Sequence, residues 1–455
     1  MENKFYENEE VMEDYSSIRP DQVHSLLKKH MLADGFSIVL DLKRSHGSRI
    51  VDEISGETYL DLFTFFASSA LGMNHERLNS EEVKNELTLA AINKPSNSDI
   101  YTTLMADFVD TFANIAKPDF MKYLFFVSGG ALAVENALKV AFDWKVQKNF
   151  LKGYKEEKGH QVIHFKEAFH GRTGYTMSLT NTDPNKVKYF PKFNWPRITN
   201  PKIIFPLVAN IENILKHEKT SIEEIHQAIK NNPDDIAAII IEPIQGEGGD
   251  NFFRKEFFLQ LREIADQNEI LLIFDEVQTG FELTGKFWAS EYYVKPDIIA
   301  FGKKAQICGI MVSDRIDDVQ EHCFRKSSRI NSTWGGNLAD MVRSKHIMRI
   351  MQEEHLVNNS FEMGEYLLGE LLNIQNEYPR LISNVRGLGL MCSFDLTNGE
   401  MRNKFASECF KNKLLILGCG SKSIRFRPAL NITQSDLNES LQIIRNILNL
   451  LSSNK

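Results

Sequence analysis

The feature that most constrains the fold is a series of short, almost wholly apolar runs separated by helical stretches between about Leu104 and Phe301. These runs include YLFFV (123–127), QVIHF (161–165), IAAIIIEPI (236–244) and ILLIFDEV (270–277). Strands that are buried on both faces show such continuous runs, because neither face needs polar side chains. The pattern therefore predicts an α/β body built on a mostly parallel sheet.

The two ends of the chain have different patterns. Residues 36–61 carry short alternating apolar runs broken by Ser-His-Gly and Ser-Gly-Glu, which predicts small hairpin strands. Beyond Trp334, helical patterns at 337–353 and 361–376 precede VRGLGLMCSFDL and a final helix. We therefore expect three parts in chain order: an N-terminal segment (1–75), a large domain (76–335) and a smaller C-terminal α+β domain (336–455). The N-terminal segment is expected to pack with the smaller domain.

Composition excludes several classes of protein. Lys+Arg total 53 and Asp+Glu total 61, giving a net charge of -8, which disfavours nucleic acid and anionic lipid as partners. The acidic start, MENKFYENEEVMEDY, has no apolar core and no apolar run is long enough to cross a bilayer, so we expect a cytoplasmic protein. The five cysteines lack CxxC spacing, so we expect no metal site.

Polar residues at strand ends are the candidates for chemistry, because ligands of open α/β sheets bind beyond the carboxyl ends of the strands. One run leads into Ser128-Gly129-Gly130-Ala131 and a helix, where backbone N–H groups can hold an anion. Another ends in Asp275-Glu276, where a buried carboxylate needs a cation or a strong donor. The plainer alternatives are a tight connection at the glycines and a capping role for the acidic pair.

Two further strand ends complete the set. PDIIAF leads into Lys303-Lys304, where desolvation can turn an amine into a nucleophile, although both lysines could also extend to solvent. IIIEPIQGEGG places Glu242, Gln245 and Glu247 at another end. An anion cradle, a buried acid and an amine are what pyridoxal 5'-phosphate (PLP) requires of a protein.

The motifs at these positions resemble class III (ω-amino acid) PLP-dependent aminotransferases, from about Thr58 to Leu430. The similar stretches are ETYLDLFTFFASSALGMNH, GGALAVENALK, AFHGRTGYTMSLT, IEPIQGEGG, IFDEVQTGF, GKKAQICG, STWGGN, RGLGLM and IRFRPAL. The resemblance implies PLP-dependent transferase fold type I, with a seven-stranded sheet in the large domain and a homodimer that shares its active sites. GGALAVENALKVAFDWK and FGKKAQICG are most similar to the branch that transfers the ε-amino group of lysine.

The resemblance also implies roles around the cofactor. Lys304 would bond to the PLP aldehyde and carry the proton, with Lys303 as a bystander, and Asp275 would pair with the pyridine nitrogen. Val277 and Phe169 would contact opposite ring faces.

The remaining cofactor contacts are implied in the same way. Gln278 would bind the phenolic oxygen beside the substrate, Gly130 and Ala131 would bind the phosphate, and Thr333 would reach the phosphate of the other subunit. Many members have Ser-Gly-Thr-Glu-Ala where this chain has Gly-Gly-Ala-Leu-Ala, so a hydroxyl to the phosphate is lost.

The substrates explain a second set of residues. The substrates that the resemblance implies are lysine and 2-oxoglutarate. The reacting keto carbon of 2-oxoglutarate bears a carboxylate, whereas the reacting ε-carbon of lysine does not. An arginine that binds this carboxylate would be unpaired while lysine reacts, so it needs a partner that can move away. We assign Arg425 as this arginine and Glu247 as its switch, with Arg172 holding the far carboxylate. Arg427 is predicted to be a surface or interface charge, and His170 a wall residue.

The function implied is transfer of the ε-amino group of L-lysine to 2-oxoglutarate. The products would be L-glutamate and 2-aminoadipate 6-semialdehyde, which cyclises to Δ1-piperideine-6-carboxylate. Alternatives are an ornithine or 4-aminobutyrate aminotransferase of the same class and a non-catalytic binding protein on this fold. A nicotinamide dehydrogenase is disfavoured because no GxGxxG follows a strand.

Overall fold

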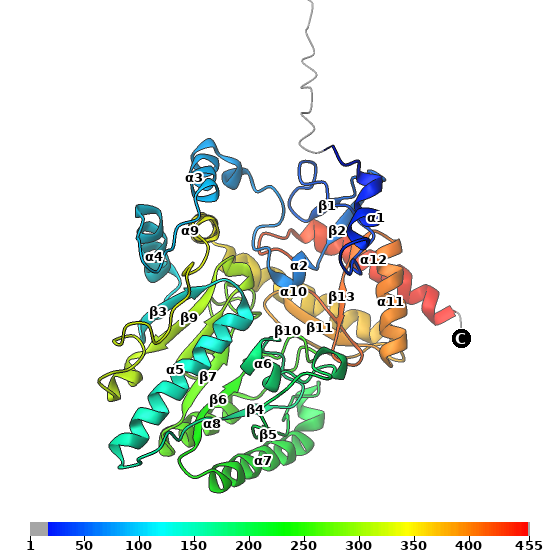
Figure 1. The fold of residues 1–455 in the computed structure, drawn as a ribbon. Coiled ribbons are helices and arrows are strands. Elements are labelled where there is room, and N and C mark those ends of the chain that lie inside the picture. The colour runs from blue at the N-terminus through cyan, green and yellow to red at the C-terminus, as the bar shows by residue number, and fades with distance from the viewer. Residues whose placement is uncertain (1–16, 454–455) are drawn as a thin grey trace, which may run out of the picture.

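A seven-stranded sheet forms the centre of the computed structural model, which describes residues 17–453 (Figure 1). Its strands, in spatial order, are β3 (Met121–Val127), β9 (Cys308–Ser313), β8 (Ile298–Phe301), β7 (Leu271–Asp275), β6 (Ile236–Ile241), β4 (Gln161–Phe165) and β5 (Arg197–Ile198). The strands from β8 to β5 are parallel, and β9 is antiparallel to both its neighbours. This confirms the predicted α/β fold with a mostly parallel sheet.

Helices cover both faces of this sheet, which explains the continuous apolar runs. In β7, Leu271 and Ile273 pack in one cluster with α5 (Gly130–Leu151). Leu272 and Phe274 point the other way, into a cluster with α8 (Lys255–Gln267) and α7 (Leu207–Asn231). Successive side chains of a strand point to opposite faces, so a strand with helices on both sides is apolar throughout.

Two smaller sheets accompany the central one, and the first of them combines strands from both ends of the chain. One contains β1 (Arg49–Val51), β2 (Thr58–Asp61) and β12 (Leu414–Leu415). The other contains β10 (Ser383–Leu388), β11 (Met391–Asp395), β14 (Ser423–Arg425) and β13 (Leu417–Cys419). The β1–β2 hairpin confirms the hairpin strands expected near the N-terminus, while the domain boundaries at 75 and 335 remain a prediction.

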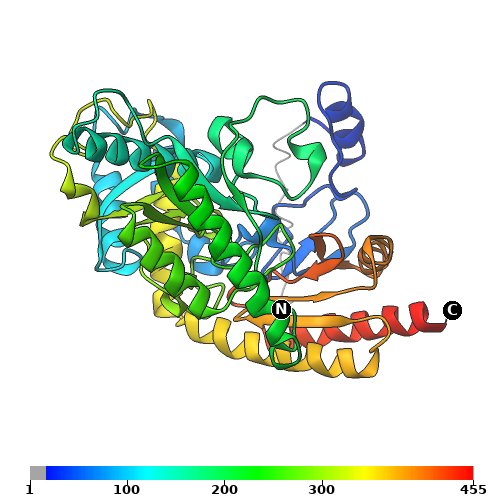
Figure 2. The same cartoon turned by 90° about the horizontal axis from the view of Figure 1, so that it is seen from below.

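The remaining helices join these parts. They are α1 (Val23–Lys28), α2 (Thr64–Ala67), α3 (Glu81–Ile92), α4 (Thr103–Ile115), α6 (Gly174–Leu179), α9 (Leu338–Glu353), α10 (Leu356–Glu377), α11 (Gly399–Lys411) and α12 (Gln434–Ser453). Figure 2 shows the yellow and orange helices of residues 338–377 and the red α12 along one side of the molecule. Within residues 17–453, no helix has the length and apolarity needed to cross a membrane. The acidic start used for the localisation prediction, residues 1–15, lies outside that range.

Candidate active site

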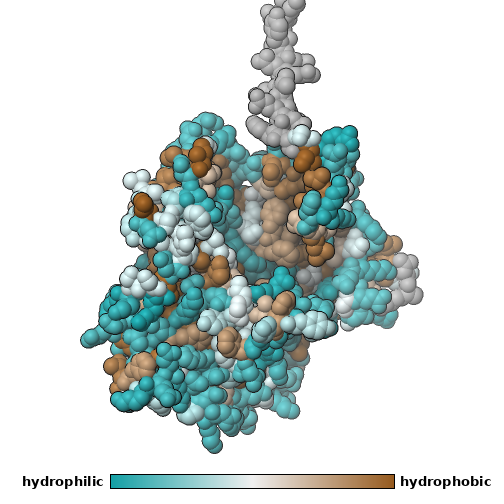
Figure 3. Space-filling view, viewed as in Figure 1, coloured by the Kyte–Doolittle hydropathy of each residue, from teal (hydrophilic) through white to brown (hydrophobic). Residues whose placement is uncertain are grey.

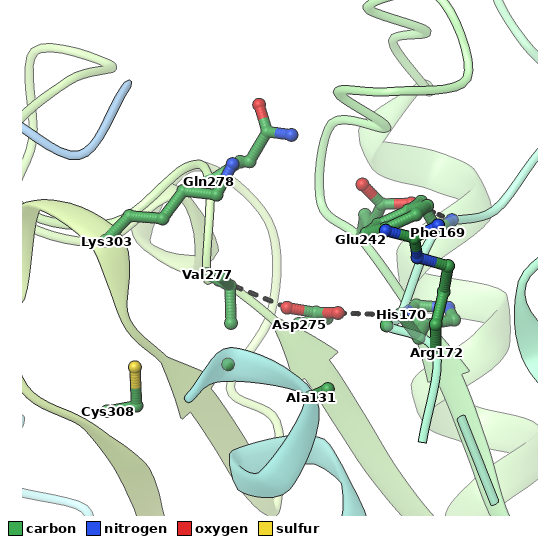
Figure 4. Close-up of a pocket in the computed structure, with 12 residues that line it drawn as sticks. Ala131, Phe169, His170, Arg172, Glu242, Asp275, Val277, Gln278, Lys303 and Cys308 are labelled. Atoms are coloured by element: carbon green, nitrogen blue, oxygen red, sulfur yellow. Dashed lines mark hydrogen bonds and ion pairs between the residues drawn. The ribbon is translucent and has the colours of Figure 1, made fainter. Parts of the chain in front are cut away.

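A cavity of about 370 Å³ lies beyond the carboxyl ends of the central parallel strands (Figure 4). It is lined by Gly130, Ala131, Phe169, His170, Gly171, Arg172, Glu242, Asp275, Val277, Gln278, Lys303 and Cys308. The structure therefore brings together most of the residues predicted from the strand ends. Four predicted site residues are not among the lining residues: Lys304, Thr333, Glu247 and Arg425.

Asp275, the last residue of β7, is held by a buried histidine. Its Oδ2 lies 2.7 Å from His170 Nδ1, and its Oδ1 accepts a bond from Val277 N at 3.1 Å. Both side chains are almost fully buried. The sequence predicted His170 only as a wall residue of the cavity. In the structure it also orients the carboxylate of Asp275.

Glu242 fixes a neighbouring part of the cavity wall. Its carboxyl accepts bonds from Phe169 N at 2.9 Å and Gly246 N at 3.0 Å. Burial raises the pKa of Glu242 to about 7. The sequence marked Glu242 only as a strand-end residue; its position behind the backbone of Phe169 shows that it helps to set where that ring lies.

The start of α5 offers the predicted anion cradle. Gly129 precedes the helix with a φ of 111° and provides no side-chain cap. The first N–H groups of an α-helix have no partner within the helix, so they are available to an anion at this end. Gly130 also approaches Val277 closely, since an added Cβ would lie 3.0 Å from Val277 Cγ1.

The two lysines point to different surroundings. Lys303 lines the cavity (Figure 4). It donates to the carbonyl oxygen of Phe66 at 2.9 Å. Lys304 donates instead to Ser69 O at 3.0 Å and Pro428 O at 3.4 Å, and is 2% exposed. The prediction that Lys304 shares a cavity with Asp275 is therefore wrong, and its neighbour occupies that place.

The reason for this difference is the turn after β8. Lys303 begins a single 3-10 turn, Lys303–Ala305, with a left-handed φ of 53°. This conformation sends the first lysine into the cavity and the second behind it. Burial lowers the pKa of Lys303 to about 7, and the positive charges of Arg425 and Arg427 add to the effect.

The predicted arginine and glutamate form an ion pair. Arg425 Nη2 lies 2.9 Å from Glu247 Oε2, and the arginine side chain is 3% exposed. Burial opposes ionisation of Glu247, but Arg425 and Lys186 outweigh it and lower its pKa. Glu247 is therefore a carboxylate that pairs with Arg425.

The other predicted residues have different outcomes. Arg427 is buried rather than at the surface, and its Nη1 lies 3.0 Å from the buried Asp250, which corrects the surface prediction. The sequence could not show this partner, because Asp250 is far away in the chain. Arg172 is exposed at the cavity. Thr333 is exposed and its carbonyl accepts from Ser96 Oγ at 2.6 Å, so its role toward another subunit stays a prediction.

Sequence reasoning missed two contributors to the site. Lys186 bonds to Glu247, and Cys308, which pairs with Val127 at the end of β3, lines the cavity. Lys186 lies in the polar stretch TNTDPNKVK, where nothing in the pattern distinguishes it from a solvated charge. Together the residues of the site can hold a flat ring that carries an anionic group and needs both an acid and an amine.

Comparison with known proteins defines the class. The family model of class-III aminotransferases matches residues 32–448, so the chain belongs to this family. It is 47% identical over 435 residues to the L-lysine-epsilon aminotransferase of Mycobacterium tuberculosis, covering 94% of this chain and 96% of the relative. The enzyme of the same name from Streptomyces clavuligerus is 43% identical over 434 residues, covering 95% of each.

More distant relatives and solved structures agree with this placement. The mitochondrial 4-aminobutyrate aminotransferase of Homo sapiens is 30% identical over 449 residues, covering 91% of this chain and 86% of the relative. A solved lysine aminotransferase from M. tuberculosis, in its internal aldimine form, superposes with a TM-score of 0.93 at 46% identity. That match covers 95% of this chain and 100% of the other.

Proposed function

We propose that the protein is a PLP-dependent aminotransferase that moves the ε-amino group of L-lysine to 2-oxoglutarate. The products are L-glutamate and 2-aminoadipate 6-semialdehyde, which cyclises to Δ1-piperideine-6-carboxylate. The observation that carries the proposal is the ion pair between Arg425 and Glu247. In this pair Glu247 would mask the arginine while lysine reacts and would release it when the carboxylate of 2-oxoglutarate binds. The identity of 43–47% to proteins named for lysine, against 30% for one named for 4-aminobutyrate, supports the donor.

The residues of the cavity fit PLP. Asp275, oriented by His170, would hold the proton at the pyridine nitrogen, and the start of α5 at Gly130 and Ala131 would bind the phosphate. Phe169 and Val277 would contact the two ring faces. The bound cofactor supplies an electron sink for the reacting carbon of the substrate.

The remaining residues would act on the reacting groups. We assign Lys303, in place of Lys304, as the amine that bonds to the cofactor aldehyde and moves the proton at the reacting carbon, because Lys303 lines the cavity. Gln278 would bind the phenolic oxygen beside the substrate, and Arg172 would hold the far carboxylate. Arg425 would bind the carboxylate beside the keto carbon once Glu247 has moved.

A homodimer is part of the proposal. Large apolar side chains are exposed on the face between α1 and α3, where brown side chains gather in Figure 3. The exposed large apolar residues of the described chain include Leu26, Phe65, Phe66, Ile92 and Ile100. Apolar surface of this kind marks a protein interface. Thr333 of each subunit would then bind the cofactor phosphate in the other subunit. We also propose that the enzyme is cytoplasmic.

Identification of the product tests the function. Lysine and 2-oxoglutarate are incubated with the PLP-loaded protein, and we expect Δ1-piperideine-6-carboxylate and glutamate. The isomeric ring formed from α-transamination would contradict ε-transfer. Single-turnover rates with ornithine and 4-aminobutyrate provide the comparison, and a colourless protein that borohydride does not alter would favour a binding protein.

A further inference from the structure

The carboxylate of Glu247 contacts two cations, one with each oxygen. Oε2 lies 2.9 Å from Arg425 Nη2, while Oε1 lies 2.6 Å from Lys186 Nζ. The backbone of Glu247 is anchored separately, because its carbonyl accepts a bond from Gly420 N at 2.9 Å. A change of partner therefore requires only rotation of the glutamate side chain.

Lys186 lies beside Phe169, which lines the cavity. It ends the 3-10 turn Pro184–Lys186, which Asp183 caps by accepting a bond from Asn185 N at 2.9 Å. The ammonium group lies 5.2 Å from the centroid of the Phe169 ring, and its side chain is 24% exposed. The lysine is thus close to both the glutamate and the ring that lines the cavity.

Release of Glu247 from Arg425 creates a charge problem. A substrate carboxylate that takes Arg425 would leave the glutamate, whose side chain is only 24% exposed, without its arginine. An unpaired carboxylate in a partly buried position is costly. Among the residues that the structure describes, Lys186 is the other cation paired with Glu247, and its long flexible stem can follow the carboxylate.

We propose that Lys186 is a positioning residue that keeps Glu247 paired while a dicarboxylate substrate occupies Arg425. Lys186 thereby favours binding of 2-oxoglutarate and glutamate, and leaves binding of lysine almost unchanged because Glu247 then keeps Arg425. This inference rests on the proposed function for its physiological substrates. The interaction itself can be tested with any five-carbon dicarboxylate.

Binding of glutarate, an unreactive dicarboxylate, is the first measurement. Calorimetry on the PLP-loaded enzyme should show that Lys186→Met weakens glutarate about tenfold, equivalent to about 1.4 kcal/mol. Lys186→Arg should restore most of the affinity, since the cation is retained. Lys188→Met is the matched control: it removes an exposed charge two residues away and should leave the affinity unchanged.

The half-reactions provide the second measurement. In single-turnover experiments, Lys186→Met should raise the apparent KM for 2-oxoglutarate about tenfold, the same factor as for glutarate, with little change in the maximal rate. The half-reaction with lysine should keep both parameters. Equal losses in the two half-reactions would overturn the proposal, because they would indicate a general structural role.

A double mutant separates positioning from direct binding. In Glu247→Ala, Lys186 no longer has the carboxylate that it pairs with, so adding Lys186→Met should not weaken glutarate binding further. A further tenfold loss would show that Lys186 binds the ligand itself and would overturn the proposal. If the wild-type protein fails to transaminate lysine, the proposed function fails, whereas glutarate binding still decides the role of Lys186.

Discussion

At the scale of single residues, two adjacent lysines lie in different surroundings, Lys303 at the cavity and Lys304 behind it. Lys303→Ala should abolish turnover, because the amine facing the cavity is lost, while the fold is kept. Lys304→Ala removes two bonds to backbone carbonyls, so it should lower stability by about 1–3 kcal/mol but leave a functional cavity. Borohydride reduction followed by peptide mass spectrometry should find the cofactor on residue 303. Attachment at residue 304 would contradict the assignment of Lys303 and support the sequence-based prediction of Lys304.

This pair also shows where sequence reasoning ends. The apolar run PDIIAF located the strand end, and with it the pair of amines, but the choice between neighbours depends on one left-handed φ in the following turn. The prediction of Arg427 failed for a related reason. Its partner Asp250 lies 177 positions earlier in the chain, and no local sequence pattern indicates that contact.

At the scale of elements, strands and helices were the most predictable features. Continuous apolar runs predicted β3, β4, β6, β7 and β8 of the central sheet, because burial on both faces leaves a strong local pattern, whereas the short β5 has no such run. The antiparallel direction of β9 was not predicted, since its run ICGIMV resembles those of the parallel strands. Direction depends on the connections between strands, which composition does not encode.

Helix α5 allows a prediction with a control at its opposite end. Gly129 and Gly153 flank the helix with φ of 111° and 99°, and an added Cβ would meet nothing within 4 Å at either. Alanine at either position should cost about 1–3 kcal/mol of stability through backbone strain. Only Gly129→Ala should also weaken PLP, by at least several-fold, because it displaces the N–H groups at the cradle.

Titration of the two apo-variants with PLP, followed by absorbance, provides the comparison. The Gly153→Ala protein should bind PLP like the wild type despite its lower melting temperature. Equal loss of PLP affinity in both variants would mean that general destabilisation, and not the position of the helix start, controls cofactor binding.

At the scale of the whole molecule, a buried ion pair joins the two main sheets. Asp250 follows β6 of the central sheet, and Arg427 follows β14 of the four-stranded sheet. Arg386, from β10, also donates to the backbone carbonyl of Asp250 at 2.8 Å. The loop that carries Glu247 is therefore fixed to the sheet that carries Arg425. This contact holds Glu247 and Arg425 in a constant relative position.

Removal of Arg427 should consequently affect the entire fold. Arg427→Met leaves the Asp250 carboxylate buried and without its cation, which should cost about 3–5 kcal/mol. The control is Arg445→Met, which breaks partly exposed pairs with Glu370 and Glu377 and should cost about 1 kcal/mol or less. Thermal unfolding of the PLP-loaded proteins measures the difference. Similar melting temperatures for the two variants would show that the buried pair does not hold the sheets together.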